Sequence, residues 1–289
     1  MTSRDVLVLG SANADLVVEV GHRPAGGETV LGGDIVVMPG GKGANTAVAA
    51  ARLGASVALL GATGSDQYGE LLRASLRDSG VDTDLVRTSE RPTGIAHITV
   101  TPDGENSIVV SPGANGDVTT DDVDAVPLHG VTVLVANLEV PVPVVEHCIA
   151  AAAAAGVRPV LNLSPVAPVS AGTLALLDPL VVNEHEARAL AGESFAALLD
   201  LGPRSAVVTL GARGAAVVTS DGVTEVAAPS VDAVDTTGAG DAFAGALAAR
   251  LAAGDDLVAA AGFAARVAAT SVTRAGAQPS YPAAEEVLP

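Results

Sequence analysis

The sequence predicts an α/β fold, in which helices flank a doubly wound, mostly parallel sheet and a small β-sheet lies beside it. The first observation is the apolar run Val6–Leu9, which ends at Gly10 and is typical of a parallel strand covered on both faces. The second is a regular alternation of strand-like and helix-like segments from about residue 131 onward. The third is a pair of strand-rich stretches, residues 13–40 and 91–114, that contain no helical segment.

In the first half of the chain, glycine marks the ends of two expected helices. Ala44–Leu53 is followed by Gly54, and Gln67–Asp78 is closed by Gly80. The expected strands share a content rich in Val, Ile or Leu: they are Asp15–Val20, Thr29–Met38, Ser56–Leu60, Ile95–Val100 and Ser107–Val110. No helix separates the first two of these or the last two. Each pair is therefore expected to form an antiparallel excursion, and the two excursions to form one small sheet.

The second half alternates between strands and helices. The expected strands are Val131–Ala136, Val160–Leu163, Leu180–Val182, Ala206–Leu210 and Ala215–Thr219. The expected helices are Val142–Ala155, Glu184–Ala191, a short one near Ala196–Leu201, Ala239–Ala253 and Leu257–Thr270. We therefore expect a main α/β domain and a small β domain, the main one made of residues 1–12, 41–90 and 115–289 and the small one of residues 13–40 and 91–114.

Composition and charge narrow the function. Fifteen basic against 33 acidic residues give a net charge of −18, which repels nucleic acid and anionic membranes, so neither is an expected partner. The N-terminal segment becomes polar too soon for a secretory signal, and no apolar run reaches the roughly 18 residues that span a bilayer. A cytoplasmic location is therefore expected. The single cysteine, Cys148, excludes an internal disulfide and a multi-cysteine zinc site, and is expected to be a small buried residue.

The strongest motif is Asp235-Thr236-Thr237-Gly238-Ala239-Gly240-Asp241, which opens an alanine-rich helix. Small residues before a helix allow its first unpaired N–H groups to point at an anion, and the helix dipole favours negative charge there. Asp241 would lie at the same helix start, placed to accept a proton from a substrate hydroxyl. The alternative is a glycine turn with an acidic residue in the first helical turn, and the complete run favours the anion site with its base.

A second glycine-rich segment, Pro39-Gly40-Gly41-Lys42-Gly43-Ala44-Asn45, opens the first expected helix. It is not a P-loop, because Lys42 is followed by glycine, and it lacks the three spaced glycines of a dinucleotide fingerprint. One cation and one amide in a tight loop suit a neutral polyhydroxyl ligand; the alternative is a helix entry with an exposed lysine. Asn13 and Asp15 follow the first strand, where ligands collect in open parallel sheets, although such residues also serve simply as turns.

Two further segments permit two interpretations each. Asn183-Glu184-His185-Glu186 is a capping box, and its position after a strand also suits nucleotide phosphates and magnesium. The polar loop from Ser271 to Ser280 offers carbonyl oxygens to a monovalent cation or is a plain surface loop. The five histidines show no metal-binding spacing, and no Gly-x-Ser-x-Gly elbow is present.

Together these segments resemble the PfkB-type family of carbohydrate and nucleoside kinases, which has the ribokinase-like fold. The motifs GSANAD, GETV, GGKGAN, TGSD, GANG, NLEVP, NEHE, TLGARGA, DTTGAGDAF and TRAGAQPS occur in the family order along nearly the whole chain. DTTGAGD is typical of the family as a whole, whereas GSANAD, GGKGAN and TRAGAQPS are similar to the branch that phosphorylates D-ribose.

The resemblance implies a role for each matching position. Asp241 would be the catalytic base, beside an anion hole of backbone amides at Gly238, Ala239 and Gly240. The positions implied to bind the sugar are Asn13, Asp15, Gly41, Lys42, Asn45, Glu139 and Asp241. Those implied to contact ATP are Asn183, Thr209, Gly211, Gly214 and Gly240. Glu186 would organise Mg²⁺ through water, and the positions implied around K⁺, mostly through carbonyl oxygens, are Asp235, Thr237, Ser271, Arg274, Gly276 and Ser280.

The implied activity is transfer of the γ-phosphoryl group of ATP to the 5-hydroxyl of D-ribose, with Mg²⁺ and activation by K⁺. The small sheet would be a lid over the sugar and the interface of a homodimer. Kinases of the same family that act on deoxyribose, fructose, a ketodeoxy sugar acid or a nucleoside are the near alternatives. A catalytically silent sugar-binding regulator would have a broken DTTGAGD segment, which is intact here, and a dehydrogenase would need the missing dinucleotide fingerprint.

Overall fold

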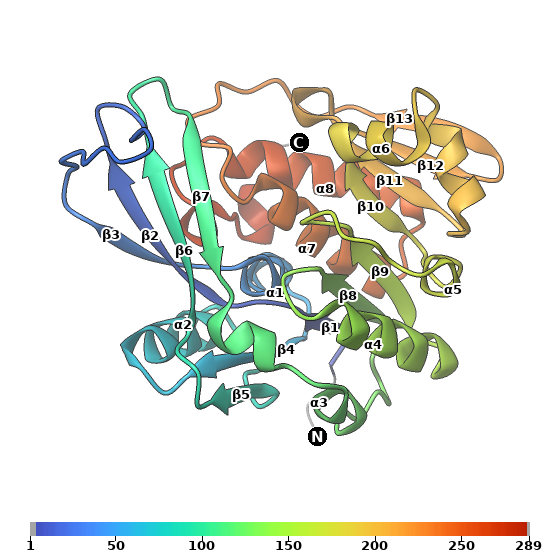
Figure 1. Ribbon diagram of the computed structural model, residues 1–289. Helices are drawn as coiled ribbons and strands as arrows, with labels where there is room; N and C mark the ends of the chain where they lie inside the picture. Colours follow the sequence, from blue (N-terminus) through green and yellow to red (C-terminus); the bar gives the residue numbers. More distant parts are fainter. Residues whose placement is uncertain (1–3, 288–289) are drawn as a thin grey trace.

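A nine-stranded sheet forms the centre of the protein in the computed structural model, which describes residues 4–287 (Figure 1). Its strands, in the order β13-β12-β11-β10-β9-β8-β1-β4-β5, are Gly222–Val226, Ala215–Thr219, Ala206–Thr209, Leu180–Asn183, Arg158–Asn162, Val133–Asn137, Val6–Leu9, Val57–Gly64 and Val86–Ser89. Along this order, all neighbouring strands from β11 to β5 pair in parallel. β12 pairs antiparallel with both β11 and β13. The predicted mostly parallel sheet is confirmed.

Helices cover both faces of this sheet. One face carries α1 (Lys42–Arg52), α2 (Gln67–Asp78), α7 (Ala239–Ala252) and α8 (Leu257–Ser271), and the other carries α3 (Thr120–Asp124), α4 (Val142–Ala154), α5 (Ala171–Leu174) and α6 (Glu184–Ala191). Each face of the sheet has its own hydrophobic core. In β1, Val6 and Val8 pack in the core on the α1 side, and Leu7 and Leu9 pack in the core on the α4 side. The sheet is therefore doubly wound, as predicted. No helix within residues 4–287 has both the length and the apolar character needed to span a membrane.

Four regular elements of the main sheet and its helices were not predicted, and each lacks a continuous apolar pattern. β5 is an edge strand with two exposed central residues, β13 is exposed over most of its length, and α3 and α5 have only five and four residues. The short helix expected near Ala196–Leu201 is a 3-10 helix over Phe195–Leu201. Short polar elements at an edge depend on their neighbours for hydrogen bonds, which a local pattern does not reveal.

The small sheet has the order β3-β2-β6-β7 and lies beside the main sheet in Figure 1. Its strands are β2 (Asn13–Glu19), β3 (Val36–Gly40), β6 (Gly94–Val100) and β7 (Asn106–Ser111). The β2–β3 and β6–β7 pairs are antiparallel as predicted, but β2 and β6 join the two hairpins in parallel. The register starts at Asn13 opposite Gly94, so both strands leave the main sheet at the same place and in the same direction.

The first expected hairpin is shorter than predicted. The extended segment Thr29–Met38 was expected to be one strand, but only the part within β3 pairs, and the preceding residues form an exposed irregular connection. Gly32 and Gly33 interrupt this connection, where Val20 and Gly32 form an isolated bridge. Glycine lowers strand stability because it has no side chain to pack.

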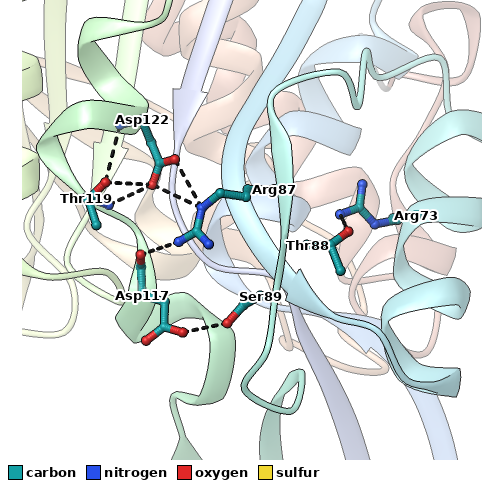
Figure 2. Close-up of polar contacts among 7 residues, drawn as sticks. All are labelled: Arg73, Arg87, Thr88, Ser89, Asp117, Thr119 and Asp122. Atoms are coloured by element: carbon teal, nitrogen blue, oxygen red, sulfur yellow. Dashed lines mark hydrogen bonds and ion pairs between the residues drawn. The ribbon is translucent and has the colours of Figure 1, made fainter.

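A polar network anchors the chain where it returns from the small sheet (Figure 2). Arg87 of β5 donates to the carbonyl oxygen of Asp117 and pairs with Asp122 at 3.1 Å, while the Ser89 hydroxyl donates to the Asp117 carboxylate. The side chain of Asp122 also completes a capping box with Thr119 at the start of α3. These contacts hold the segment after β7 against the edge strand β5.

Helices α1 and α7 approach closely enough to require glycine. A Cβ atom at Gly245 of α7 would lie 2.5 Å from the carbonyl oxygen of Thr46 and 2.9 Å from the amide nitrogen of Ala50, both in α1. Backbone atoms cannot yield as a flexible side chain can, so the contact depends on the missing side chain.

Replacement of Gly245 by alanine should destabilise the protein by about 1–3 kcal/mol, because the added methyl group forces the two helices apart. Gly262, inside α8, is the matched control, since a Cβ atom there meets nothing within 4 Å. Gly262→Ala should stabilise by about 0.5–1 kcal/mol through helix propensity. Urea unfolding midpoints measure both; equal shifts of the same sign would contradict the assigned packing.

Candidate active site

The residues predicted to bind the sugar and the predicted base Asp241 lie near the carboxyl end of β1, where α1 and α7 both begin. The amide of Ala44 in α1 donates to the carbonyl oxygen of Ser11 at 2.8 Å, directly after β1. A Cβ atom at Gly43 would lie 2.5 Å from the backbone of Gly10, so the helix start is pressed against this turn. Gly41, with a φ of 90°, provides the positive backbone angle needed to enter α1.

Asp241 lies in the first turn of α7 and is only 6% exposed. The side-chain amide of Asn45 in α1 donates to its Oδ2 at 2.9 Å, which leaves Oδ1 for another donor. Burial raises the pKa of Asp241, while the charge of Lys42 and the Asn45 hydrogen bond lower this pKa and the charge of Glu139 raises it. The charge of Lys42 and the amide of Asn45 thus stabilise the ionised form of this buried carboxylate.

A second carboxylate organises the turn after β1. Glu139 Oε2 accepts from the hydroxyl of Ser11, from the backbone amide of Lys42 at 3.2 Å and from the side chain of Asn13 at 3.5 Å. Asn13 is also held by Asn115, whose Nδ2 donates to its Oδ1 at 2.7 Å. The main chain at Asn13 therefore cannot move without breaking a buried network.

A third carboxylate, Asp15 of β2, faces the same space. Its pKa is raised from 3.8 to about 7 by burial first, and then by the negative charges of Glu139 and Asp241. The structure thus brings seven predicted residues into one group, called here the polar cluster: Asn13, Asp15, Gly41, Lys42, Asn45, Glu139 and Asp241. Lys42, the only lysine of the sequence, belongs to this cluster, and its charge lowers the pKa of Asp241.

The start of α7 offers unpaired backbone amides. Gly238 precedes the helix with a φ of 73°. The amide of Ala239, predicted to belong to the anion hole, instead donates to the carbonyl oxygen of Thr236 at 3.2 Å. Within residues 4–287, no protein acceptor lies within hydrogen-bond reach of the amides of Gly240 and Asp241. Such amides, aligned with the helix dipole, are suited to an anion.

A cavity of about 330 Å³, called here the apolar cavity, begins beside these amides. Gly240 and Ala239 line it, together with the predicted Thr209, Gly211 and Gly214. Aliphatic and aromatic side chains also line it, among them Phe243, Ala265, Ala268 and Val272. Its size and lining suit a flat ring system whose polar tail reaches the amides of α7.

Asn183 and Glu186 form the capping box that the sequence predicts. The Asn183 side chain accepts from the amide of Glu186 at 2.8 Å, and Glu186 accepts from the amide of Asn183 at 2.7 Å. Asn183 pairs in register with Thr209 on the neighbouring strand, at the edge of the apolar cavity. Glu186 is nearly buried and fixed in orientation, which suits a carboxylate acting on Mg²⁺ through water.

The loop predicted to hold K⁺ is brought against the DTTGAGD segment. Asp235 accepts from the amides of Thr237 at 2.9 Å and Gly276 at 2.8 Å, so each of its carboxylate oxygens accepts one hydrogen bond from the protein. The hydroxyls of Ser271 and Ser280 donate to nearby carbonyl oxygens. The bond between Gly276 and Asp235 joins the two segments predicted to surround K⁺.

Arg274, also predicted for the K⁺ loop, directs its side chain to Glu286 at 2.9 Å. Only its backbone is therefore available to a cation. Within the described chain, no group of three or more His, Cys, Asp and Glu side chains forms a metal site. Cys148 is buried in the core, as predicted, and burial raises the pKa of its thiol to about 12.

The sequence model of the pfkB carbohydrate kinase family matches residues 3–284 of this chain. The chain belongs to the pfkB family of carbohydrate kinases. A ribokinase of Bacillus subtilis is 41% identical over 98% of this chain and 98% of its own, and a deoxyribokinase of Salmonella typhimurium is 34% identical over 98% of this chain and 97% of its own. The structure of Arabidopsis thaliana ribokinase complexed with ribose and ATP superposes with a TM-score of 0.90 at 32% identity, covering 99% of this chain and 97% of that one.

Membership in the pfkB family confirms that the protein is a carbohydrate kinase with the ribokinase-like fold. Several residues that support the polar cluster were not predicted. Asn115 belongs to the GANG motif, which was noted only for its order along the chain, and Gln278 belongs to the GAQPS segment. Tyr281 and Arg52 carry no local signal, because their roles arise only when distant segments meet.

Replacement of Asp15 by asparagine should stabilise the sugar-free protein at pH 8 by about 2–4 kcal/mol, because wild-type Asp15 must then ionise in a buried, negative site. The folded-state pKa of about 7 lies above the ordinary 3.8. The contribution of Asp15 to the free energy of unfolding is fully present below about pH 4, and it is therefore lost as the pH rises to about 7. Thermal unfolding at pH 5 and pH 8 measures the effect, and the gain should be smaller at pH 5.

The exposed Asp34, in the connection between β2 and β3, provides the control for this measurement. Asp34→Asn should leave the melting temperature nearly unchanged at both pH values. A gain of the same size for both variants would show that relief of the overall negative charge, and not the setting of Asp15, explains the result.

Proposed function

We propose that this carbohydrate kinase transfers the γ-phosphoryl group of ATP to the 5-hydroxyl of D-ribose. The observation that carries the proposal is the position of Asp241. It belongs to the polar cluster on one side, and on the other it follows Gly240, which borders the apolar cavity. An acceptor hydroxyl held by the polar cluster and a phosphate chain that extends from the apolar cavity would meet at this position. The ribokinase relatives and the ribose and ATP complex of one of them support the same assignment.

In this proposal the polar cluster holds and orients the sugar. Asn13, Asp15 and Asn45 offer hydrogen-bond partners for adjacent hydroxyls, and Glu139 fixes the turn that carries them. Asp241 accepts the proton of the attacking hydroxyl through the oxygen that Asn45 does not engage. Positioning and proton removal are the main tasks of the protein in phosphoryl transfer.

The amides at the start of α7 stabilise the charge that develops on the transferred group. Gly240 and Asp241 present N–H groups without protein acceptors, and the dipole of α7 adds to their effect. Asn183, Thr209, Gly211 and Gly214 would hold ATP. Mg²⁺, organised through water by Glu186, would neutralise phosphate charge when bound, and K⁺ would bind among the carbonyl oxygens of the loop at Asp235, Thr237, Ser271, Arg274, Gly276 and Ser280.

The charge of the polar cluster favours a neutral acceptor. Three carboxylates, Asp15, Glu139 and Asp241, surround the acceptor position with Lys42 as their only cation. A sugar acid would bring a fourth negative charge into this partly buried site, which like-charge repulsion opposes. Ribose, deoxyribose and fructose are neutral, so the charge argument separates them from a ketodeoxy sugar acid.

The small sheet would close over the sugar as a lid and form a homodimer. Asp15 reaches the polar cluster from β2, so the lid itself would carry part of the sugar site. The outer strands β3 and β7 expose Val36, Ile108 and Val109, which is an apolar surface suited to a second copy. Closure would exclude water, which competes with the sugar for the phosphoryl group. ATP as co-substrate agrees with the expected cytoplasmic location.

A coupled assay of ADP formation tests the substrate. With ATP and Mg²⁺, kcat/KM should be highest for D-ribose in a panel with 2-deoxyribose, fructose, a nucleoside and a ketodeoxy sugar acid, and the sugar acid should rank last. Turnover should be faster in KCl than in NaCl of equal ionic strength. A higher kcat/KM for 2-deoxyribose would replace ribose by the substrate of the Salmonella relative.

The variant Asp241→Asn tests the mechanism. It should lower kcat by roughly 10²–10⁴-fold because the amide cannot accept the hydroxyl proton, while calorimetric ribose affinity changes little. Asp221→Asn, at the exposed turn between β12 and β13, is the matched control and should keep full activity. A near-normal kcat in the Asp241 variant would rule out the base role.

A further inference from the structure

The C-terminal segment Gln278–Tyr281 contacts both parts of the proposed catalytic centre. Gln278 is 2% exposed and its Nε2 donates to Asn45 Oδ1 at 3.0 Å. Tyr281, equally buried, donates its hydroxyl to the carbonyl oxygen of Gly238 at 3.1 Å. Neither residue belongs to the polar cluster, yet one contacts the partner of Asp241 and the other contacts the residue before α7.

Arg52, at the end of α1, fixes this segment. Its Nη1 donates to the carbonyl oxygens of Gln278 at 2.6 Å and Tyr281 at 2.9 Å. A guanidinium that donates to two carbonyl oxygens three residues apart restrains the backbone between them. The side chains of Gln278 and Tyr281 are therefore presented from a rigid base.

The hydrogen bonds of this region form a chain with one direction. Ser75 Oγ donates to Gln278 Oε1 at 2.9 Å, Gln278 donates to Asn45, and Asn45 donates to Asp241. An ionised carboxylate only accepts, so Asn45 must present its NH₂ group to Asp241 and its carbonyl oxygen to Gln278. Gln278 must then present its own NH₂ group to Asn45, which leaves Oε1 for the Ser75 hydroxyl.

We propose that Gln278 is a positioning residue that holds the Asn45 amide in the orientation that donates to Asp241 and so keeps this base ionised. The role rests on the proposed function, because it matters only if Asp241 is the base. Without a donor at position 278, the Asn45 amide can turn over and present its oxygen to Asp241. That arrangement requires a protonated Asp241, which cannot accept a proton from the sugar.

Other charged and titratable groups also act on Asp241. They are Lys42 of α1, Glu139 after β8, Asp15 of β2 and Tyr281 of the C-terminal segment. None of these side chains hydrogen-bonds to Gln278, so a change confined to the Ser75–Gln278–Asn45 chain leaves them in place. A shift in the ionisation of Asp241 can then be attributed to that chain.

The near-isosteric variant Gln278→Glu tests the proposal through the pH profile of kcat. Ionised glutamate offers only acceptors, so Asn45 should turn its NH₂ group away from Asp241. The acidic limb of the profile should move up by roughly 1–2 pH units. At pH values below the wild-type acidic limb this is a loss of about 10–100-fold in kcat, largely recovered above the shifted limb.

Two further variants separate orientation from general damage to the fold. Ser75→Ala, at a partly exposed position, removes the first donor of the chain. It should move the acidic limb in the same direction by a smaller amount. Tyr281→Phe disturbs the same segment without touching the chain, and should lower kcat by a similar factor at every pH. Thermal unfolding checks that each variant is folded.

Profiles of Gln278→Glu and Ser75→Ala that parallel the wild type at all pH values would overturn the proposal and leave Gln278 a packing residue. Failure of the proposed function has a different signature, because the wild type would then phosphorylate none of the sugars in the panel. If the wild type prefers another sugar, the profiles are measured with that sugar and the same comparison applies.

Discussion

The central constraint of this structure is the burial of a carboxylate that must remain ionised to act as the proposed base. Asp241 lies at the mouth of α7 with Asp15 and Glu139 nearby, and burial together with Glu139 raises its pKa. Three features oppose that rise: the charge of Lys42, the hydrogen bond from Asn45 and the positive end of the α7 dipole. Each must be held at close range, because electrostatic stabilisation falls with distance. The surrounding fold can be understood as the means of keeping them there.

The packing of α1 on α7 provides most of this control. Gly245 allows the backbone of α7 to approach the backbone of α1, and Gly43 allows α1 to begin against the turn after β1. Asn45 and Lys42 are therefore carried to Asp241 by helices whose separation has little freedom. The low aromatic content of the chain, 2% of residues, agrees with this close helix packing.

Much of the architecture was predictable from the sequence because its elements are strongly patterned. The strands β1, β8 and β10 are continuous apolar runs, and α6 was predicted with its correct limits. By contrast, β5 and β13 are polar edge strands that exist only through their neighbours. The parallel pairing of β2 with β6 joins segments about 80 residues apart, and no local pattern encodes such a register.

The candidate site likewise contains residues that the sequence motifs predicted and residues that they did not predict. Residues in dense motifs, such as Asn13, Lys42 and Asp241, were predicted and lie together in the polar cluster. Asn115 and Gln278 were not assigned roles, although both are buried and hydrogen-bonded to motif residues. Their importance depends on which side chain they touch across the fold, which sequence spacing does not report. The glycines Gly211, Gly214 and Gly240 show the converse, since their motifs predicted a site before the cavity that they line was known.

The buried position of Tyr281 has a spectroscopic consequence. The chain contains no tryptophan and only two tyrosines, so no indole emission masks the phenol signal. Tyr68 is partly exposed on α2, whereas Tyr281 hydrogen-bonds to the residue that opens α7. Ultraviolet absorbance and fluorescence of the unlabelled protein thus contain one solvent-accessible and one interior chromophore. The interior one reports directly on the surroundings of the helix at which phosphate would arrive.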